Sequence, residues 1–340
     1  MVLKLIAKVE SGSGLTRAES ELVMEQLLDG RLEEAHIVRL LLGLREKGET
    51  VEELVGFARA IRSHAEPVFA TTSRPDGVIL DTCGTGGDAS GVFNVSTAVA
   101  LVAAGAGVRV AKHGNRSISS KSGSADVFEA LGISLETSPA RAGEAIANVG
   151  IGFLFAPAVH KAVRHAMTAR RQIGARTVFN LLGPLTNPAG ATAQLAGVFS
   201  EDVIEKVAQA LAELGVERAF VVHGLDGLDE ISLSAKTAVA EVKNGSVRTY
   251  RIGPQDFGLS PESREALLGG DPQANAQILR ALLSGEKGAK RNLVLANTSA
   301  ALVASGAASD FRDGVRLAAQ AIDSGAARAK LDALIAFLRS

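Results

Sequence analysis

The 340-residue chain carries 36 Lys and Arg against 37 Asp and Glu, a formal net charge of −1, and 46% of its residues are hydrophobic. This length suits two domains, or one large domain with a helical extension, and the balanced charge argues against a nucleic-acid partner. The single cysteine, Cys83, excludes an internal disulfide and fits a reducing compartment. Because the N-terminal apolar run is too short for a signal peptide and no run approaches the roughly 20 residues of a membrane helix, we expect a cytoplasmic protein with no membrane partner.

The first segment, residues 1–70, is predicted to form a small helical domain. Two of its stretches, Thr16–Glu19 and Thr50–Glu53, have the spacing of a capping box at a helix N-terminus. Between them, an apolar stripe recurs at helical spacing, formed by Ile37, Leu40, Leu41 and Leu44. Pro67 ends this region.

From Gly77 onward, short apolar runs alternate with helical patterns, which is typical of an α/β domain with a mainly parallel central sheet. The expected strands are Val78–Leu80, Val108–Ala111, Ile151–Phe155 and Ala219–Val222, followed by a hairpin of Ala238–Val242 and Val247–Arg251 at a sheet edge. Helices are expected over Val95–Ala104, from about Ser124, and again after Pro261. We therefore place an α/β domain over residues 75–340.

A glycine-rich loop, Asp81–Asp88, follows the first expected strand and contains Gly84, Gly86 and Gly87. Without Cβ atoms, the backbone N–H groups of such a loop can converge on an anion. The next helix opens at Asn94–Thr97, whose amides and hydroxyls suit a phosphate. A tight turn without any ligand fits this loop equally well. The loop lacks the motifs of a P-loop and of a dinucleotide-binding site.

A second polar loop, Lys112–Ser124, follows the second expected strand and holds three cations, five serines and two glycines. It also precedes a helix that we expect Ser124 to cap. This position favours an anion site over an ordinary solvated loop. Two adjacent anion loops indicate a ligand with two separated phosphate groups.

Two further stretches carry candidate binding residues. His160 and Arg170 could hold an aromatic ring and a carboxylate, although a packing histidine and a surface cation are the commoner roles. The stretch His223–Glu230 places Asp229 and Glu230 after a strand, where carboxylates suit Mg²⁺ held together with phosphates. An Asp- and Gly-rich turn is the equal alternative there. Cys83 is interpreted as a small packing residue.

Taken together, these motifs resemble the anthranilate phosphoribosyltransferase family over nearly the whole chain and in the family's order. The resemblance rests on GTGGD at 84–88, NVST at 94–97, KHGNRSISSKSGS at 112–124, RTVFNLLGPLTNPA at 176–189, HGLDGLDEISL at 223–233 and GGDPQANAQILRALLSGE at 269–286. It implies the phosphoribosyltransferase fold shared with pyrimidine nucleoside phosphorylases. It also implies a homodimer joined through the helical domains, each completed by part of 160–195.

The resemblance further implies transfer of a phosphoribosyl group from 5-phosphoribosyl 1-pyrophosphate to anthranilate, with Mg²⁺, in tryptophan biosynthesis. The implied donor-binding residues are Gly84, Gly87, Asp88, Asn94, Ser96, Thr97, Lys112, Asn115, Arg116, Ser117, Ser119, Ser120 and Ser124. The implied anthranilate-binding residues are Gly84, His113, Asn115, His160 and Arg170. The implied metal-contacting residues are Ser96, Asp229 and Glu230. No general acid or base is assigned, because an aromatic amine is neutral at pH 7.

Three positions depart from the family pattern, namely Val92, Lys161 and Leu225. We expect them to affect affinity and not the class of reaction. Two rival functions remain, a pyrimidine nucleoside phosphorylase of the same fold and a non-catalytic nucleic-acid-binding relative. The intact KHGNRS segment argues against the first, and the balanced charge argues against the second.

Overall fold

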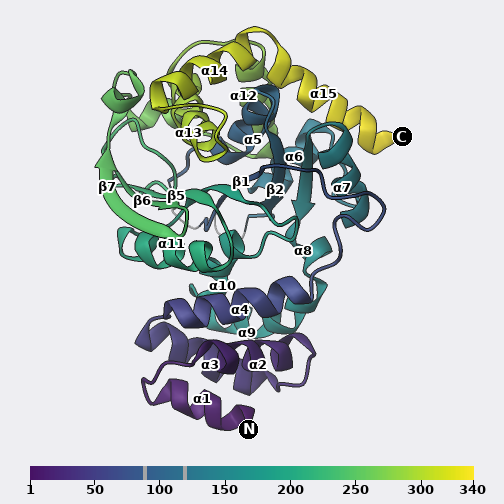
Figure 1. Cartoon of the computed structure of the whole chain (residues 1–340), viewed down its shortest axis with the longest axis vertical. Coiled ribbons are helices and arrows are strands. Elements are labelled where there is room, and N and C mark those ends of the chain that lie inside the picture. The colour runs from purple at the N-terminus through teal and green to yellow at the C-terminus, as the bar shows by residue number, and fades with distance from the viewer. Residues whose placement is uncertain (87–89, 118–120) are drawn as a thin grey trace.

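The computed structural model describes residues 1–86, 90–117 and 121–340. A helical layer forms one end of the molecule, and a sheet covered by helices forms the other (Figure 1). The chain begins in the helical layer and ends beyond the sheet, at the opposite end. The predicted combination of a helical domain with a larger α/β domain is confirmed. Within the described residues, no helix has the length and apolar character needed to cross a bilayer.

The helical layer is built from four N-terminal helices and two later ones. These are α1 (Val2–Glu10), α2 (Arg17–Leu28), α3 (Glu34–Lys47), α4 (Val51–Ser63), α9 (Met167–Ile173) and α10 (Val178–Leu182). Both predicted capping boxes are present, at Thr16 and at Thr50. The helix α1 was not anticipated from the sequence. Ala169 and Phe179, on the two later helices, share one apolar cluster with Leu40 and Leu54 of the N-terminal helices, so residues far apart in sequence build this layer together.

The described part of the chain forms a single seven-stranded sheet in the order β3-β2-β1-β4-β5-β6-β7. Its strands are β1 (Ile79–Gly84), β2 (Arg109–Gly114), β3 (Ile151–Phe155), β4 (Ala193–Gly197), β5 (Arg218–Gly224), β6 (Thr237–Lys243) and β7 (Ser246–Ile252). The first five strands pair in parallel, whereas β6 and β7 form an antiparallel hairpin at the edge. The predicted mainly parallel sheet and its edge hairpin are therefore confirmed, and β4 is a strand that the sequence analysis missed.

Helices cover both faces of this sheet, as its nearly uninterrupted burial requires. One face carries α5 (Val95–Gly105), α6 (Ser124–Leu131), α12 (Pro272–Leu283), α13 (Ala289–Ala304), α14 (Phe311–Asp323) and α15 (Ala326–Arg339). The other face carries α11 (Ile204–Glu213) and α10, with α7 (Pro139–Asn148) near β3. Figure 1 shows α11 between the sheet and the helical layer.

The short helical segments connect these elements. They are α8 (Ala156–Val159), η1 (Lys161–Ala166), η2 (Gly183–Leu185), η3 (Glu201–Val203), η4 (Pro254–Phe257) and η5 (Arg264–Leu267).

The boundaries of the first two strands correct the sequence analysis. The strand β1 starts at Ile79 and continues to Gly84, and β2 continues to Gly114. Their last residues were assigned to loops because they are polar, yet Asp81 and Lys112 are almost completely buried. Polar residues at the ends of strands therefore mark the site here and not the start of a loop.

Candidate functional site

The C-terminal ends of β1 and β2 are joined by hydrogen bonds from side chains, beyond the last residues that pair through their backbones. The paired residues are Ile79 with Arg109 and Leu80 with Val110. Beyond them, the backbone N–H of His113 donates to Asp81 Oδ1 at 3.1 Å, and Lys112 Nζ donates to the Thr82 carbonyl at 2.5 Å. These contacts hold the two strand ends together while their loops diverge. The site begins in that opening, at the carboxyl edge of a parallel sheet.

Lys112 brings a buried cation to the junction of the two loops. Its side chain is 1% exposed, and Nζ also donates to Ser96 Oγ, at 3.2 Å, at the start of α5. Burial lowers the pKa of Lys112, and the nearby carboxyls of Asp81 and Glu230 oppose that shift. Burial likewise raises the pKa of Asp81. The two groups thus sit in one desolvated environment in which each affects the charge of the other.

The loop after β5, residues 225–236, is called the acidic loop because it brings Asp229 to the glycine-rich turn after β1. The amide of Gly86 donates to Asp229 Oδ2 at 3.0 Å. A Cβ at Gly84 would lie 2.8 Å from the same oxygen, and a Cβ at Gly197 would lie 1.5 Å from the Asp229 backbone oxygen. The side chain of Asp229 can therefore approach β1, and its backbone can approach β4, because both positions are glycine.

The second carboxylate of the acidic loop reaches the start of α5. The amide of Ser96 donates to Glu230 Oε1 at 3.1 Å, as expected for an anion at a helix N-terminus. Thr82 Oγ1 in turn donates to the carbonyl of Ser96 at 3.0 Å. The structure thus brings together Ser96, Asp229 and Glu230, the three predicted metal-contacting residues. Their oxygen-only donor set suits Mg²⁺ shared with phosphates, although the described residues contain no cluster of three or more His, Cys, Asp or Glu that could bind a metal alone.

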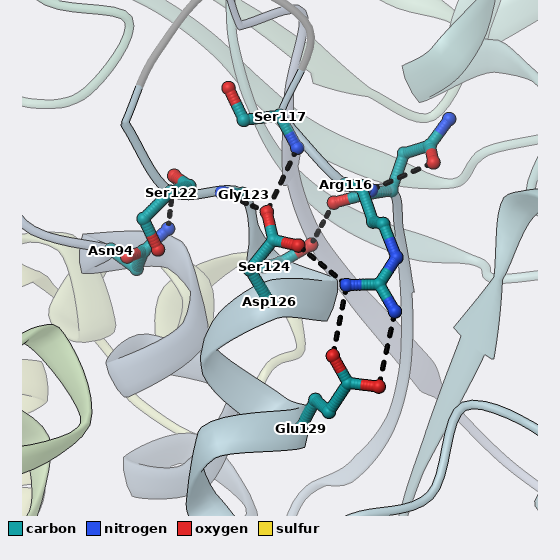
Figure 2. Close-up of polar contacts among 9 residues, drawn as sticks. Asn94, Arg116, Ser117, Ser122, Gly123, Ser124, Asp126 and Glu129 are labelled. Carbon is teal, nitrogen blue, oxygen red and sulfur yellow. Dashed lines mark hydrogen bonds and ion pairs between the residues drawn. The ribbon is translucent and has the colours of Figure 1, made fainter. Parts of the chain in front are cut away.

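The loop after β2, residues 115–123, is called the basic loop, and its two described ends meet at one carboxylate (Figure 2). Asp126 Oδ2 accepts from the amides of Ser117 and Gly123, at 3.1 and 2.9 Å. Arg116 donates to Asp126 Oδ1 at 2.8 Å and to both oxygens of Glu129 at 2.9 and 3.1 Å. Arg116 was predicted to bind the donor, but here two carboxylates of α6 already balance its charge.

Asn94 links the basic loop to the C-terminal part of the chain. Its Nδ2 donates to the carbonyl of Ser122 at 3.1 Å, and its Oδ1 accepts from Asn275 Nδ2 at 2.8 Å. Asn275, on α12, also pairs with both backbone groups of Gly270. The predicted donor-binding amide is therefore already engaged on both sides. Sequence reasoning missed Asn275, although it lies inside one of the recognised motifs.

The expectation that Ser124 caps α6 is wrong. The cap residue is Gly123, and Ser124 is the first residue of the helix. Asp126 supplies the capping contact instead, because its carboxylate accepts from the Gly123 amide. The Ser124 hydroxyl faces the carbonyl of Asn115 at 3.4 Å. A glycine is required at 123, since a Cβ there would lie 2.4 Å from the amide nitrogen of Ser117.

Two buried histidines form a wall on the opposite side of β2 from Lys112. The rings of His113 and His160 meet edge to face, with centroids 5.1 Å apart. Burial lowers the pKa of His113 to about 3 and that of His160 to about 4, so both rings are neutral at pH 7. His113 Nδ1 lies 3.2 Å from the Gly183 carbonyl, which makes Nδ1 the protonated nitrogen and leaves Nε2 as an acceptor.

The remaining predicted residues are distributed as follows. Arg170, on α9 of the helical layer, lies over the ring of Phe179 at 5.1 Å, and burial lowers its pKa. Thr97 is fully buried, and its hydroxyl has no hydrogen-bond partner among residues 1–86, 90–117 and 121–340. Cys83 is buried and its Sγ accepts from Gln194 Nε2 at 3.0 Å, which confirms its packing role. The predicted donor-binding positions Gly87, Asp88, Ser119 and Ser120 lie outside the described residues.

The three departures from the family pattern lie around the site and not within its polar network. Val92 forms an isolated bridge with Leu268. Lys161 pairs with Glu66 at 3.2 Å. Leu225 is 39% exposed at the start of the acidic loop.

Both domains of the chain match known proteins in sequence and in structure. A family model described as the a/b domain of a glycosyl transferase family matches residues 76–328, and its helical bundle domain matches residues 3–65. The chain is 54% identical to the anthranilate phosphoribosyltransferase of Myxococcus xanthus, covering 98% of both chains. It is similar to the crystal structure of the Thermus thermophilus anthranilate phosphoribosyltransferase, with a TM-score of 0.92 and 44% identity over 98% of this chain and 99% of that one. The Saccharomyces cerevisiae enzyme in complex with PRPP and Mg is similar with a TM-score of 0.89 and 28% identity over 99% and 98% of the two chains.

Proposed function

The chain belongs to the anthranilate phosphoribosyltransferase family, and from this membership we propose that it transfers the 5-phosphoribosyl group of 5-phosphoribosyl 1-pyrophosphate to the amine of anthranilate. The products are N-(5-phosphoribosyl)anthranilate and pyrophosphate, and the reaction serves L-tryptophan biosynthesis. The observation that supports it most is the meeting of Lys112, Ser96, Asp229 and Glu230 where the glycine-rich turn and the basic loop open from neighbouring strands.

Positioning and electrostatic stabilisation carry the reaction in this site. The amine nitrogen of anthranilate attacks C1 of the ribose while pyrophosphate leaves, with inversion at C1 and a charge distribution resembling an oxocarbenium ion. Lys112 lies where it opposes negative charge growing on the leaving group. When bound at Ser96, Asp229 and Glu230, Mg²⁺ supplies further neutralisation of that charge. The amides of the two loops bind and orient the phosphates.

We place anthranilate against His113, His160 and Arg170, with Gly84 and Asn115 at the side nearer the ribose. Two neutral imidazoles suit an aromatic ring, and the Arg170 guanidinium suits a carboxylate. The amine of anthranilate is neutral at pH 7, so the chain needs no strong base. The Nε2 acceptor of His113 contributes a hydrogen-bond partner on this wall.

One assay tests the function directly, because anthranilate is fluorescent and its fluorescence is lost when the ribosyl bond forms. We expect that loss on mixing with 5-phosphoribosyl 1-pyrophosphate and Mg²⁺. Phosphorolysis of thymidine or uridine in the same preparation would instead identify a nucleoside phosphorylase. Binding of nucleic acid without turnover would identify a non-catalytic relative.

The substrate assignment is tested by Arg170→Ala, with the exposed neighbour Arg171→Ala as the matched control. We expect Arg170→Ala to raise the KM for anthranilate about tenfold or more, since it removes a charged hydrogen-bond donor. The KM for the sugar donor should stay unchanged in both variants. An unchanged anthranilate KM in Arg170→Ala would refute the placement of the carboxylate.

We also propose that the chain acts as a cytoplasmic homodimer joined through the helical layer. Leu3 and Leu42, on α1 and α3, are 52% and 43% exposed. A contiguous exposed apolar patch marks a protein interface, and our proposal is that these two residues of neighbouring helices belong to one. Sedimentation of the wild type against a Leu3→Lys, Leu42→Lys variant tests this, because a dimer using this surface should dissociate in the variant.

A further inference from the structure

One buried side chain outside the site forms hydrogen bonds with the backbone of the acidic loop. Asn297 lies in the middle of α13 and is 0% exposed. Its Oδ1 accepts from the Ile231 amide at 2.9 Å, and its Nδ2 donates to the Ile231 carbonyl at 3.0 Å. Nδ2 also donates to the carbonyl of Leu293 at 3.0 Å, one turn earlier in the same helix. A single carboxamide thus pairs both backbone groups of the residue that follows Glu230.

The helix that carries Asn297 is a rigid support. Thirteen of the sixteen residues of α13 are buried, and the helix packs against α5, α14 and strands β4 and β5. A polar residue in such an apolar environment costs free energy unless its hydrogen bonds are made. Within the described residues, Asn297 meets that requirement through Leu293 and Ile231. If the acidic loop moved, the buried amide of Asn297 would lose hydrogen bonds, and if the amide were removed, the loop would lose its support.

The contacts beside Ile231 show which side chains depend on its hydrogen bonds to Asn297. The side chain of Ile231 is 1% exposed and belongs to the main apolar cluster of the sheet. Directly before it, Glu230 accepts from the Ser96 amide and Asp229 accepts from the Gly86 amide. Both carboxylates thus project from a backbone that is fixed one residue later. A shift of Ile231 would move them relative to the starts of α5 and of the glycine-rich turn.

We propose that Asn297 is a positioning residue that aligns Asp229 and Glu230 for the magnesium-bound sugar donor, an inference that rests on the proposed function. Asn297 touches neither substrate nor metal and acts through the backbone of Ile231. Partners that orient metal ligands from outside the coordination sphere commonly change metal affinity by about 10- to 100-fold when they are mutated. The chain places this role on α13, 66 residues from Ile231 and far in sequence from the proposed donor-binding residues.

The test compares Asn297→Asp with Ser299→Ala. The aspartate is nearly isosteric, but it places an oxygen opposite the carbonyls of Ile231 and Leu293 in place of the donating Nδ2. Ser299 is a matched control, because it is equally buried on the same helix and its hydroxyl donates to the Phe311 carbonyl at 2.6 Å, away from the acidic loop. Asn297→Ser is the second variant, which removes the amide without adding charge and serves if the aspartate does not fold.

Two measurements do not depend on turnover. Amide hydrogen exchange of the protein without substrate and metal should accelerate about tenfold over residues 229–233 in the Asn297 variants, and around residue 311 only in Ser299→Ala. Electron paramagnetic resonance of Mn²⁺ in the presence of 5-phosphoribosyl 1-pyrophosphate should show about tenfold weaker metal binding in the Asn297 variants alone. The KM for anthranilate should stay within about twofold.

The inference is overturned if the Asn297 variants match Ser299→Ala in exchange over 229–233 and in Mn²⁺ affinity. It is also overturned if the anthranilate KM rises as much as the metal dissociation constant, since that pattern indicates a general loss of structure. Failure of the proposed function looks different. In that case the wild-type protein itself would form no product and would show no donor-dependent binding of Mn²⁺.

Discussion

The acidic loop and the basic loop meet at the same edge of the sheet but are held by different kinds of contact. The acidic loop is fixed from beneath by neutral hydrogen bonds to the fully buried Asn297 and by close packing against Gly197. The basic loop is tied at its two ends by Asp126 and by Arg116, whose side chains are 17% and 47% exposed. The middle of the acidic loop is thus part of the core, whereas the ends of the basic loop are held largely by charged side chains nearer to solvent.

This difference indicates a division of labour between the two loops. Buried neutral hydrogen bonds are insensitive to salt and hold their groups in place, which suits the carboxylates that we propose as metal ligands. Charged contacts near solvent are weaker and easily exchanged for contacts to a phosphate. We therefore expect the acidic loop to be preformed before substrate binds and the basic loop to rearrange its contacts when the donor arrives.

The largest effect on activity is expected from Gly197→Ala, which disrupts the close packing of β4 against the acidic loop. The new Cβ would lie 1.5 Å from the backbone oxygen of Asp229, so the loop must move by about 1 Å or more. A displacement of that size costs about 100-fold in kcat/KM. Gly14→Ala is the control, because its Cβ would make only an ordinary contact of 3.5 Å with Thr50. Steady-state kinetics in which both variants lose activity equally would contradict this explanation.

A smaller effect is expected from Asp126→Asn, which weakens the hydrogen bonds that join the two ends of the basic loop. The asparagine keeps one acceptor oxygen, but it loses the charge-assisted contacts to Ser117, Gly123 and Arg116. We expect the KM for the sugar donor to rise about tenfold, while the affinity for Mn²⁺ measured with saturating donor stays unchanged. A fall in that metal affinity would mean that the two loops are not independent.

Lowering the pH should reduce the stability of the protein through His113 and His160, while the carboxylates of both loops stay charged. The pKa values of His113 and His160 lie at about 3 and 4 because burial disfavours the imidazolium, against about 6.5 in the unfolded chain. The stability contributed by the neutral rings is therefore fully present above pH 6.5 and is lost as the pH falls towards 4. Linkage gives a loss of about 1 kcal/mol per histidine between pH 7 and pH 5.5. Urea unfolding should show this slope, and His160→Gln should reduce it by about half.

Much of this organisation could be predicted from the sequence, and the reason is local. Capping boxes at Thr16 and Thr50, the apolar strands and the Asn244–Gly245 hairpin each follow from residues adjacent in the chain. The two proposed anion loops are recognisable because their glycines and serines are clustered in short segments. The same local reasoning assigned Asp81 and Lys112 to loops, because a single sequence does not show that two ionisable residues are buried near one another at the ends of neighbouring strands.

The contacts that could not be predicted all join distant segments. Asn297 and Ile231 are 66 residues apart, and Asn275 and Asn94 are 181 residues apart. The signal for Asn297 in the sequence is weak, because Thr298 and Ser299 follow it directly and the three polar residues stand together in one helical segment. Such a run indicates that hydrogen bonds are made there but does not name their partners. The contacts of Arg116 could not be predicted for a related reason. Its balancing carboxylates, Asp126 and Glu129, lie on the following helix, and only the fold shows that they face it.

The smallest and most discriminating effect should come from salt. Raising NaCl from about 50 to about 500 mM shortens the screening distance from roughly 14 Å to roughly 4 Å, which weakens exposed pairs such as Arg116 with Glu129. Hydrogen exchange at the Ser117 and Gly123 amides should then rise about two- to threefold, since their common acceptor Asp126 loses part of its support. Residues 229–233 should not respond, because the backbone contacts of Ile231 are made by the buried, neutral Asn297. Glu129→Gln should already raise exchange at low salt and reduce the further response, whereas an equal response of both loops would remove the distinction between them.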